Sequence, residues 1–273
     1  MSERQFDPER YTGMPDGTYV PSPQLIKNAR MLIVGYEADP EVLESALPPG
    51  LDPHPNNLVQ MNMYRVPSAE QTSHLDPYTL TYLTVEVADR DSRAISAAQG
   101  EIPVPGRFWV GYWNDSPQMQ AYTREGGGIP TLDGACEWEE ADGELSSTLS
   151  VDGTPVIEAE ASVGDEQVDT LTGHLHYYAH RQIPDPAGGR AQINELVEFP
   201  IPFVSELYEA EVDRVDFDFP DGSPFQRFAP VEPLSTPSVL HGTVTFTYSQ
   251  GRRVRDYLAE EASRGLSSDV SDR

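Results

Sequence analysis

The strongest constraint on this fold is a succession of short apolar stretches that alternate as β-strands do, with few helical patterns between them. Residues 58–66 (LVQMNMYRV), 77–89 (PYTLTYLTVEVAD) and 106–114 (GRFWVGYWN) are the clearest strands. Asp-Gly pairs at 142–143 and 152–153 are typical of hairpin turns. Strands that recur at such short intervals favour a mainly β (β-rich α+β) fold with closed or strongly curved antiparallel sheets.

The first strand pattern covers residues 29–39, and a helix is expected only directly after it. Pro40 opens the segment PEVLESAL, whose apolar residues recur at helical spacing. No internal repeat and no linker divides the chain, so we expect a single domain over residues 1–258. Residues 1–20 are rich in Pro, Gly and charge and predict an irregular arm, and the polar residues 259–273 predict a flexible tail.

The charge of the chain is strongly acidic, with 45 Asp and Glu against 18 Lys and Arg and a net charge of −27. Such a chain is not expected to bind nucleic acid through phosphates, and anionic membranes repel it. Lys27 is the sole lysine. Together these features predict a halophilic, salt-adapted protein. A GC-rich genome is the alternative; it would explain the missing lysines but not the acid excess.

Several classes of site and location are not expected from this sequence. It has no apolar run long enough to span a bilayer, and its polar start MSERQFDPERYTG is unlike a signal peptide, which predicts a soluble, cytoplasmic protein. The single cysteine, Cys136, excludes internal disulfides. Alternating histidines in HLHYYAH (residues 174–180) could bind a metal, but no partner of matching spacing accompanies them, so an exposed strand face is favoured. We therefore expect no cofactor and no metal.

The strand at 106–114 ends in an unexpected way. Its residues form two alternating sets, Phe108, Val110 and Tyr112 on one face and Trp109, Gly111 and Trp113 on the other. Two tryptophans so close together predict a strand that is packed on both faces. The apolar run then stops at Asn114 and Asp115, which are also common turn residues.

Over most of its length the chain resembles the acetoacetate decarboxylase family. NARMLIVGYEADPEVLESALPPGL is similar to the first strand and helix of that family, and PYTLTYLTVEV to a strand that carries a Y-T-E motif. GRFWVGYWND is similar to the G-R-E-x-x-G-[YF]-P-K-K strand. An A-P-x-x-P-L run at Ala229–Leu234 and a D-Y-L triplet at Asp256–Leu258 extend the resemblance. It implies an antiparallel β-barrel or cone with a few short helices, an apolar pocket, and a homo-oligomer.

The departures from the family pattern bear on catalysis. In the family, the first lysine of P-K-K forms a Schiff base with a β-keto acid. The resemblance places Trp113 at the proline, Asn114 at that lysine and Asp115 at the second lysine. An amide cannot form an imine, and a carboxylate reverses the field that lowers a lysine pKa. The glutamate of Y-T-E falls on Leu80, and the family arginine falls on Ala29 or its neighbour Arg30.

The family register makes Asn114 a candidate at the floor of the pocket, although a turn after a buried strand would also explain it. Lys27 precedes the first strand, close to the position of the family arginine, and is either a retained catalytic amine or a surface residue. Glu86 shares strand parity with Leu80 and is either a pocket carboxylate or a solvated acid.

Gln60, Asn62 and Tyr64 share one face of a strand that matches a pocket-lining strand of the family. Uncharged polar groups at this place would bind a carbonyl or hydroxyl of a substrate, to which Trp113 is a further candidate contact. The alternative is the wet face of a half-buried sheet.

Three functional hypotheses follow. The first is an enzyme, a decarboxylase-like lyase, that acts on a small keto or enol acid or a related carbonyl or carboxylate compound without a Schiff base. Its enolate would be stabilised by donors from Asn114, Gln60, Asn62, Tyr112 and Arg30. The second is a Schiff-base decarboxylase that uses Lys27. The third is a small-molecule-binding protein that has kept the fold and lost catalysis.

The excess of acidic over basic residues predicts that salt stabilises the folded protein. We expect the melting temperature to rise between about 0.1 M and about 2 M potassium chloride, because salt screens repulsion between the many carboxylates. Differential scanning calorimetry across that range measures the change. A melting temperature that stays constant or falls would contradict salt adaptation.

Overall fold

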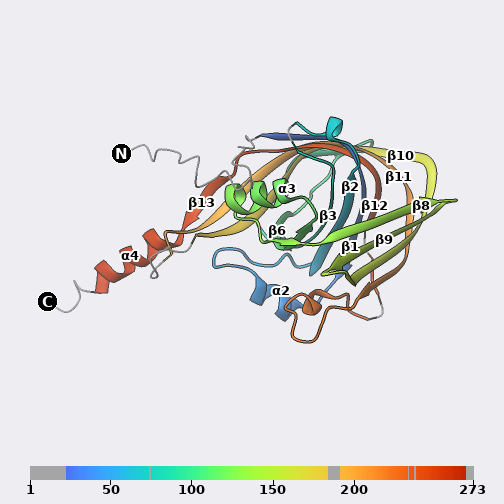
Figure 1. The fold of residues 1–273 in the computed structure, drawn as a ribbon. Helices are drawn as coiled ribbons and strands as arrows, with labels where there is room; N and C mark the ends of the chain where they lie inside the picture. Colours follow the sequence, from blue (N-terminus) through green and yellow to red (C-terminus); the bar gives the residue numbers. More distant parts are fainter. Residues whose placement is uncertain (1–22, 74, 184–190, 233, 237, 269–273) are drawn as a thin grey trace.

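The computed structural model describes residues 23–73, 75–183, 191–232, 234–236 and 238–268, and the expected N-terminal arm at residues 1–20 lies outside them (Figure 1). The strands of these residues form one 13-stranded sheet. The prediction of a mainly β protein with a few short helices is confirmed. No helix of the described residues is both long and apolar enough to cross a membrane.

Seven strands of this sheet close into a barrel. They are β1 (Gln24–Glu37), β2 (Leu58–Val66), β3 (Tyr78–Val87), β6 (Gly106–Asn114), β10 (Thr154–Ile183), β11 (Ile193–Phe217) and β12 (Ser238–Tyr248). Around the barrel the order is β11-β12-β1-β2-β3-β6-β10, and β10 pairs with β11 to complete the ring. All neighbours are antiparallel except β6 and β10, which run parallel.

The remaining strands extend the barrel wall. They are β4 (Arg93–Ala97), β5 (Gly100–Glu101), β7 (Thr131–Asp133), β8 (Ala135–Ala141), β9 (Glu144–Val151) and β13 (Arg252–Asp256). The hairpin turns predicted at 142–143 and 152–153 join β8 to β9 and β9 to β10. All four turn residues have positive φ, as a two-residue type I′ turn requires.

The helices are short and lie at the edges and ends of the barrel (Figure 1). The predicted helix is α2 (Pro40–Ala46), where Asp39 accepts a hydrogen bond from the Glu41 amide. The other short helical segments are α3 (Pro117–Ala121), a π-helical turn at Tyr122–Gly127, and 3-10 turns at Ala69–Gln71 and Gln226–Phe228.

The segment predicted to be a flexible tail, residues 259–273, is described as far as residue 268, and residues 269–273 lie outside the described part of the chain. The chain forms helix α4 (Tyr257–Ser268), which extends away from the barrel (Figure 1). The sequence YLAEEASRGL is rich in Ala, Glu and Leu, which have high helix propensity. Helix formation in this segment therefore agrees with local propensity, which the polar composition had masked.

The barrel wall separates two apolar cores. Along β2, the side chains of Val59, Met61 and Met63 pack in an outer core against residues of β8 and β9. Tyr64 and Val66 of the same strand pack in an inner core with residues of β3, β6, β11 and β12. The period-two pattern predicted for residues 58–66 thus separates the inside of the barrel from the outside.

A β-bulge in β6 changes the faces predicted for GRFWVGYWN. Leu83 pairs with Gly111 while the next residue, Thr84, pairs with Trp109, so one residue of β6 is left over. As a result Trp109 and Tyr112 both belong to the inner core, with ring centroids 6.3 Å apart. Strict alternation had placed these two side chains on opposite faces, and that prediction is wrong.

Candidate functional site

The barrel encloses a cavity of about 340 Å³. All seven barrel strands contribute side chains to its lining. The segment that includes β4 and β5 adds Ile95 and residues 102–105 (IPVP). The volume lies within the range of about 300–1,000 Å³ that is usual for small-molecule sites.

Charged and polar side chains meet on one side of this cavity. Glu86 on β3 and Arg107 on β6 are direct cross-strand partners and are 4% and 7% exposed. The Glu86 carboxylate accepts one hydrogen bond from Gln60 Nε2 at 2.8 Å and another from Asn56 Nδ2 at 3.0 Å. These two amides fix the carboxylate on the cavity wall, and a guanidinium lies on the neighbouring strand.

Arg107 is the least satisfied polar group of the cavity lining. Its Nε and Nη1 atoms are enclosed and have no hydrogen-bond partner among the described residues. Burial lowers the pKa of the guanidinium, but Tyr177, Glu86 and Tyr82 outweigh this, so the pKa stays above its ordinary value. The cavity therefore holds a permanent cation with spare donors, and such donors cost free energy until an acceptor binds them.

Tyrosines fill the inner core beside the charged pair. Tyr82 and Tyr177 share a hydrogen bond of 3.0 Å between their hydroxyls. Tyr248 contacts the hydroxyls of both Tyr64, at 2.9 Å, and Tyr112, at 2.7 Å. Burial raises the pKa of Tyr64, Tyr112 and Tyr248 well above the ordinary value, so these hydroxyls stay protonated at neutral pH.

The structure brings together four of the residues predicted as substrate contacts. Gln60, Asn62 and Tyr64 line the cavity from β2, and Glu86 lines it from β3. Tyr112 is fully buried in the inner core and does not line the cavity, but it contacts the lining through its hydrogen bond to Tyr248 and its stacking on Tyr82.

Asn114 does not lie at the floor of the cavity, where we expected it. On β6 the inward side chains follow in the order Arg107, Trp109, Tyr112 and Asn114, and only the first two line the cavity. Asn114 is 0% exposed, and its Oδ1 accepts a hydrogen bond from the Ser116 amide at 3.1 Å. That contact is the one a turn residue makes at the end of a strand.

The other three predicted residues also lie away from the cavity lining. Arg30 forms an ion pair with Glu140 of β8. Lys27 is exposed on β1. Trp113 points to the outer core, where its ring centroid is 4.7 Å from that of Phe225. The side chains on β1 alternate, so the buried neighbour Ala29, and not Arg30, faces the inner core.

Arg107 and Tyr177 are cavity residues that the sequence did not single out. Arg107 belongs to the G-R pair of the quoted strand, and its parity with Trp109 was the available signal. The two residues are partners in the parallel pairing of β6 with β10. Strands that lie so far apart in the chain give no local pattern from which that pairing could be predicted.

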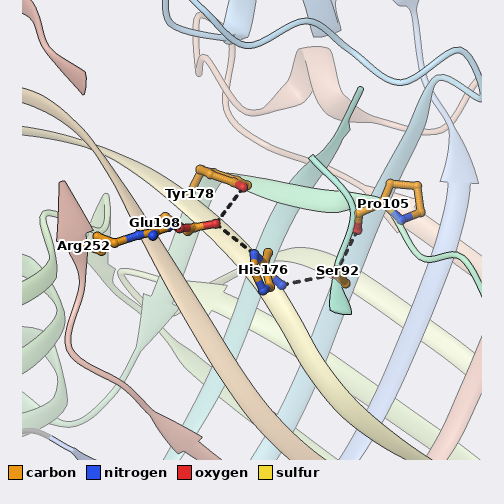
Figure 2. Close-up of polar contacts among 6 residues, drawn as sticks. All are labelled: Ser92, Pro105, His176, Tyr178, Glu198 and Arg252. Carbon is orange, nitrogen blue, oxygen red and sulfur yellow. Dashed lines mark hydrogen bonds and ion pairs between the residues drawn. The ribbon is translucent and has the colours of Figure 1, made fainter. Parts of the chain in front are cut away.

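A polar contact outside the cavity anchors segment 92–105, which contributes to the cavity lining (Figure 2). The His176 amide donates to Ser92 Oγ at 3.1 Å, and the Ser92 hydroxyl donates to the Pro105 carbonyl at 3.5 Å. Pro105 itself lines the cavity. Ser92 therefore ties both ends of the segment 92–105 to the barrel strand β10.

Glu198 of β11 contacts the side chain of His176, whose backbone amide bonds to Ser92 (Figure 2). Its carboxylate receives hydrogen bonds from Tyr178 at 3.1 Å and Arg252 Nε at 2.9 Å, and lies 2.8 Å from His176 Nδ1. Burial raises the Glu198 pKa, but hydrogen bonds from Arg252, His176 and Tyr178 outweigh it, so the pKa lies below the ordinary value. His176 is thus buried against a carboxylate, whereas we had expected the histidines of residues 174–180 on an exposed strand face. The neighbouring His174 is exposed, as expected.

Comparison with known proteins places the chain in a family. The profile of the acetoacetate decarboxylase (ADC) family matches residues 8–258. No curated protein matches the sequence.

Solved structures share the fold at low sequence identity. A structure of acetoacetate decarboxylase is 19% identical, with a TM-score of 0.72, over 88% of this chain and 92% of that one. The acetoacetate decarboxylase of Legionella pneumophila is 18% identical, with a TM-score of 0.71, over 94% and 100%. The enduracididine biosynthesis enzyme MppR, complexed with pyruvate, is 16% identical, with a TM-score of 0.62, over 89% and 95%.

The position of Asn114 predicts a loss of stability on substitution. In Asn114→Leu the buried Ser116 amide loses its acceptor, which should cost about 1–3 kcal/mol of unfolding free energy. Urea denaturation measures this cost, and titration with acetoacetate measures ligand binding by the folded variant. We expect binding to be unchanged. Full stability together with lost binding would instead give Asn114 a direct role in the site.

Proposed function

This chain belongs to the acetoacetate decarboxylase family, and from that premise we propose that it is a lyase-type enzyme for a small keto or enol acid. The substrate binds inside the barrel, and the reaction uses no Schiff base at the position of the family lysine, where this sequence has Asn114. The observation that carries the proposal is the enclosed Arg107 guanidinium, with spare donors, beside the oriented Glu86 carboxylate.

The two charged groups have complementary roles in such a reaction. Arg107 binds the anionic oxygens of the substrate and stabilises the negative charge that develops on a carbonyl oxygen as an enolate forms. The surrounding apolar side chains strengthen this interaction because they exclude water. Glu86 transfers a proton at the adjacent carbon, and its hydrogen bonds from Gln60 and Asn56 hold it in place for that step.

Enolate chemistry is common to decarboxylation and to proton abstraction beside a carbonyl. In a decarboxylation, the electron pair of the broken carbon–carbon bond moves onto the carbonyl oxygen, and a proton is then added at carbon. A Schiff base serves as the electron sink in the family. In this chain the guanidinium of Arg107 stabilises the negative charge instead, because a cation can do so without a covalent bond to the substrate.

The position of Lys27 supports the non-covalent route. This is the only lysine of the sequence, it is exposed, and it does not line the cavity. An unburied amine lacks the desolvation that makes a lysine nucleophilic at neutral pH.

Borohydride trapping tests the absence of an imine. We expect no covalent adduct after incubation with acetoacetate and sodium borohydride, because no lysine is among the described residues that line the cavity. Intact-mass spectrometry with peptide mapping provides the measurement. An adduct on Lys27 that disappears in Lys27→Arg would establish the Schiff-base mechanism in place of the one proposed.

Substitution of the charged pair tests the two roles separately. Arg107→Leu should weaken the binding of a small acid by about ten- to a hundredfold, or about 1.5–3 kcal/mol, because a charge-assisted hydrogen bond is lost. Its stability should fall, because the buried Glu86 carboxylate and Tyr177 lose the cation beside them, so binding is measured on the folded variant. Glu86→Gln should keep binding and lower the turnover.

Arg214→Leu is the matched control for these variants. Arg214 is half-exposed on β11, pairs with Glu160 and Asp216, and does not line the cavity. Calorimetric titration measures binding, and consumption of the acid measures turnover. If Arg107→Leu binds acids as well as Arg214→Leu does, the proposed site is wrong.

A further inference from the structure

The cavity has a largely apolar side that the proposed reaction leaves unused. The polar residues Gln60, Glu86 and Arg107 come from β2, β3 and β6, which are neighbours in the barrel order. The contiguous strands β10, β11 and β12 form the facing part of the ring. They contribute Leu171, Leu175, Ile201, Phe203, Leu240 and Val244 to the lining.

The segment that includes β4 and β5 adds further apolar lining. Residues 102–105 (IPVP) and Ile95 line the cavity, and Ile102 is 38% exposed. Strand β4 pairs with β10, so this apolar lining adjoins the lining that β10 contributes.

The size of the cavity exceeds what a short keto acid needs. At about 340 Å³ it falls within the range of sites for drug-sized molecules, whereas acetoacetate has only about seven non-hydrogen atoms. A short acid bound at Arg107 would leave the leucine and phenylalanine side chains of β10–β12 facing water. Apolar surface exposed in this way favours a ligand that covers it.

We propose that the preferred ligand is an amphipathic acid, with its carboxylate and carbonyl at Arg107 and an unbranched aliphatic tail along β10, β11 and β12. The inference rests on the proposed function, because Arg107 and Glu86 supply the site for the head of the molecule. The two parts of the ligand match the two arcs of the barrel. An uncharged apolar ligand does not fit this arrangement, since it would bury Arg107 without an acceptor.

A homologous series of acids tests the tail. The probes are straight-chain 2-oxo acids of about four to ten carbons, which are stable to spontaneous decarboxylation, and primary alcohols of the same lengths as controls without the acid. Each buried methylene should lower the dissociation constant by about fourfold, which corresponds to ~0.8 kcal/mol, until the cavity is full. The alcohols should bind more weakly at every length.

A pair of variants assigns the effect to the apolar wall. In Leu240→Asn we expect the gain per methylene to disappear while the shortest acid binds within about twofold of the wild-type affinity. Leu240 lines the cavity from β12. Val204→Asn is the matched control, because Val204 is 43% exposed on β11 and does not line the cavity. It should keep the full dependence on chain length.

The outcomes separate this inference from the proposed function. Short acids that bind through Arg107 with no gain from longer chains would overturn the tail and leave the proposed function in place. A gain that persists unchanged in Leu240→Asn would also overturn the assignment to this wall. If no acid binds and Arg107→Leu changes nothing, the proposed function itself fails.

Discussion

Closure of the barrel by β10 is the constraint on which the site depends. This strand pairs in parallel with β6 on one side and antiparallel with β11 on the other, so the ring has no open edge at that point. Closure places Tyr177 next to Arg107 and shields the inner core from water. In such an enclosure, charge interactions are stronger than at the surface, and an unpaired donor is more costly.

The consequence is an interior in which charge and apolar surface are divided between two arcs. Glu86 is held by two amide donors, while the neighbouring Arg107 keeps two nitrogen atoms without partners among the described residues. This difference in hydrogen bonding distinguishes a binding site from a core whose polar groups are all paired. The carboxylate is already held in place, whereas the guanidinium can still donate hydrogen bonds to a ligand. The contact from His176 through Ser92 to Pro105 fixes segment 92–105, which adds apolar side chains to the lining.

The sequence predicted the elements well and the inward side chains only in part. The bounds of β2 agreed with the predicted residues 58–66, and strict alternation correctly put Gln60, Asn62 and Tyr64 together. The same rule failed in β6, because a bulge after Trp109 shifts the register and local periodicity does not reveal a bulge. Arg107 was missed for a different reason. Its surroundings come from β3 and β10, and non-local pairing decides whether an arginine on a strand is solvated or enclosed.

A crystal structure of the protein with a stable 2-oxo acid bound tests the central claim most directly. We expect the acid inside the barrel, with its carboxylate within about 3 Å of the Arg107 guanidinium nitrogens, the Glu86 carboxylate beside the reacting carbon, and no covalent link to the protein. Electron density that joins the ligand to Lys27, or a ligand bound at Asn114 with Arg107 left unpartnered, would contradict this claim.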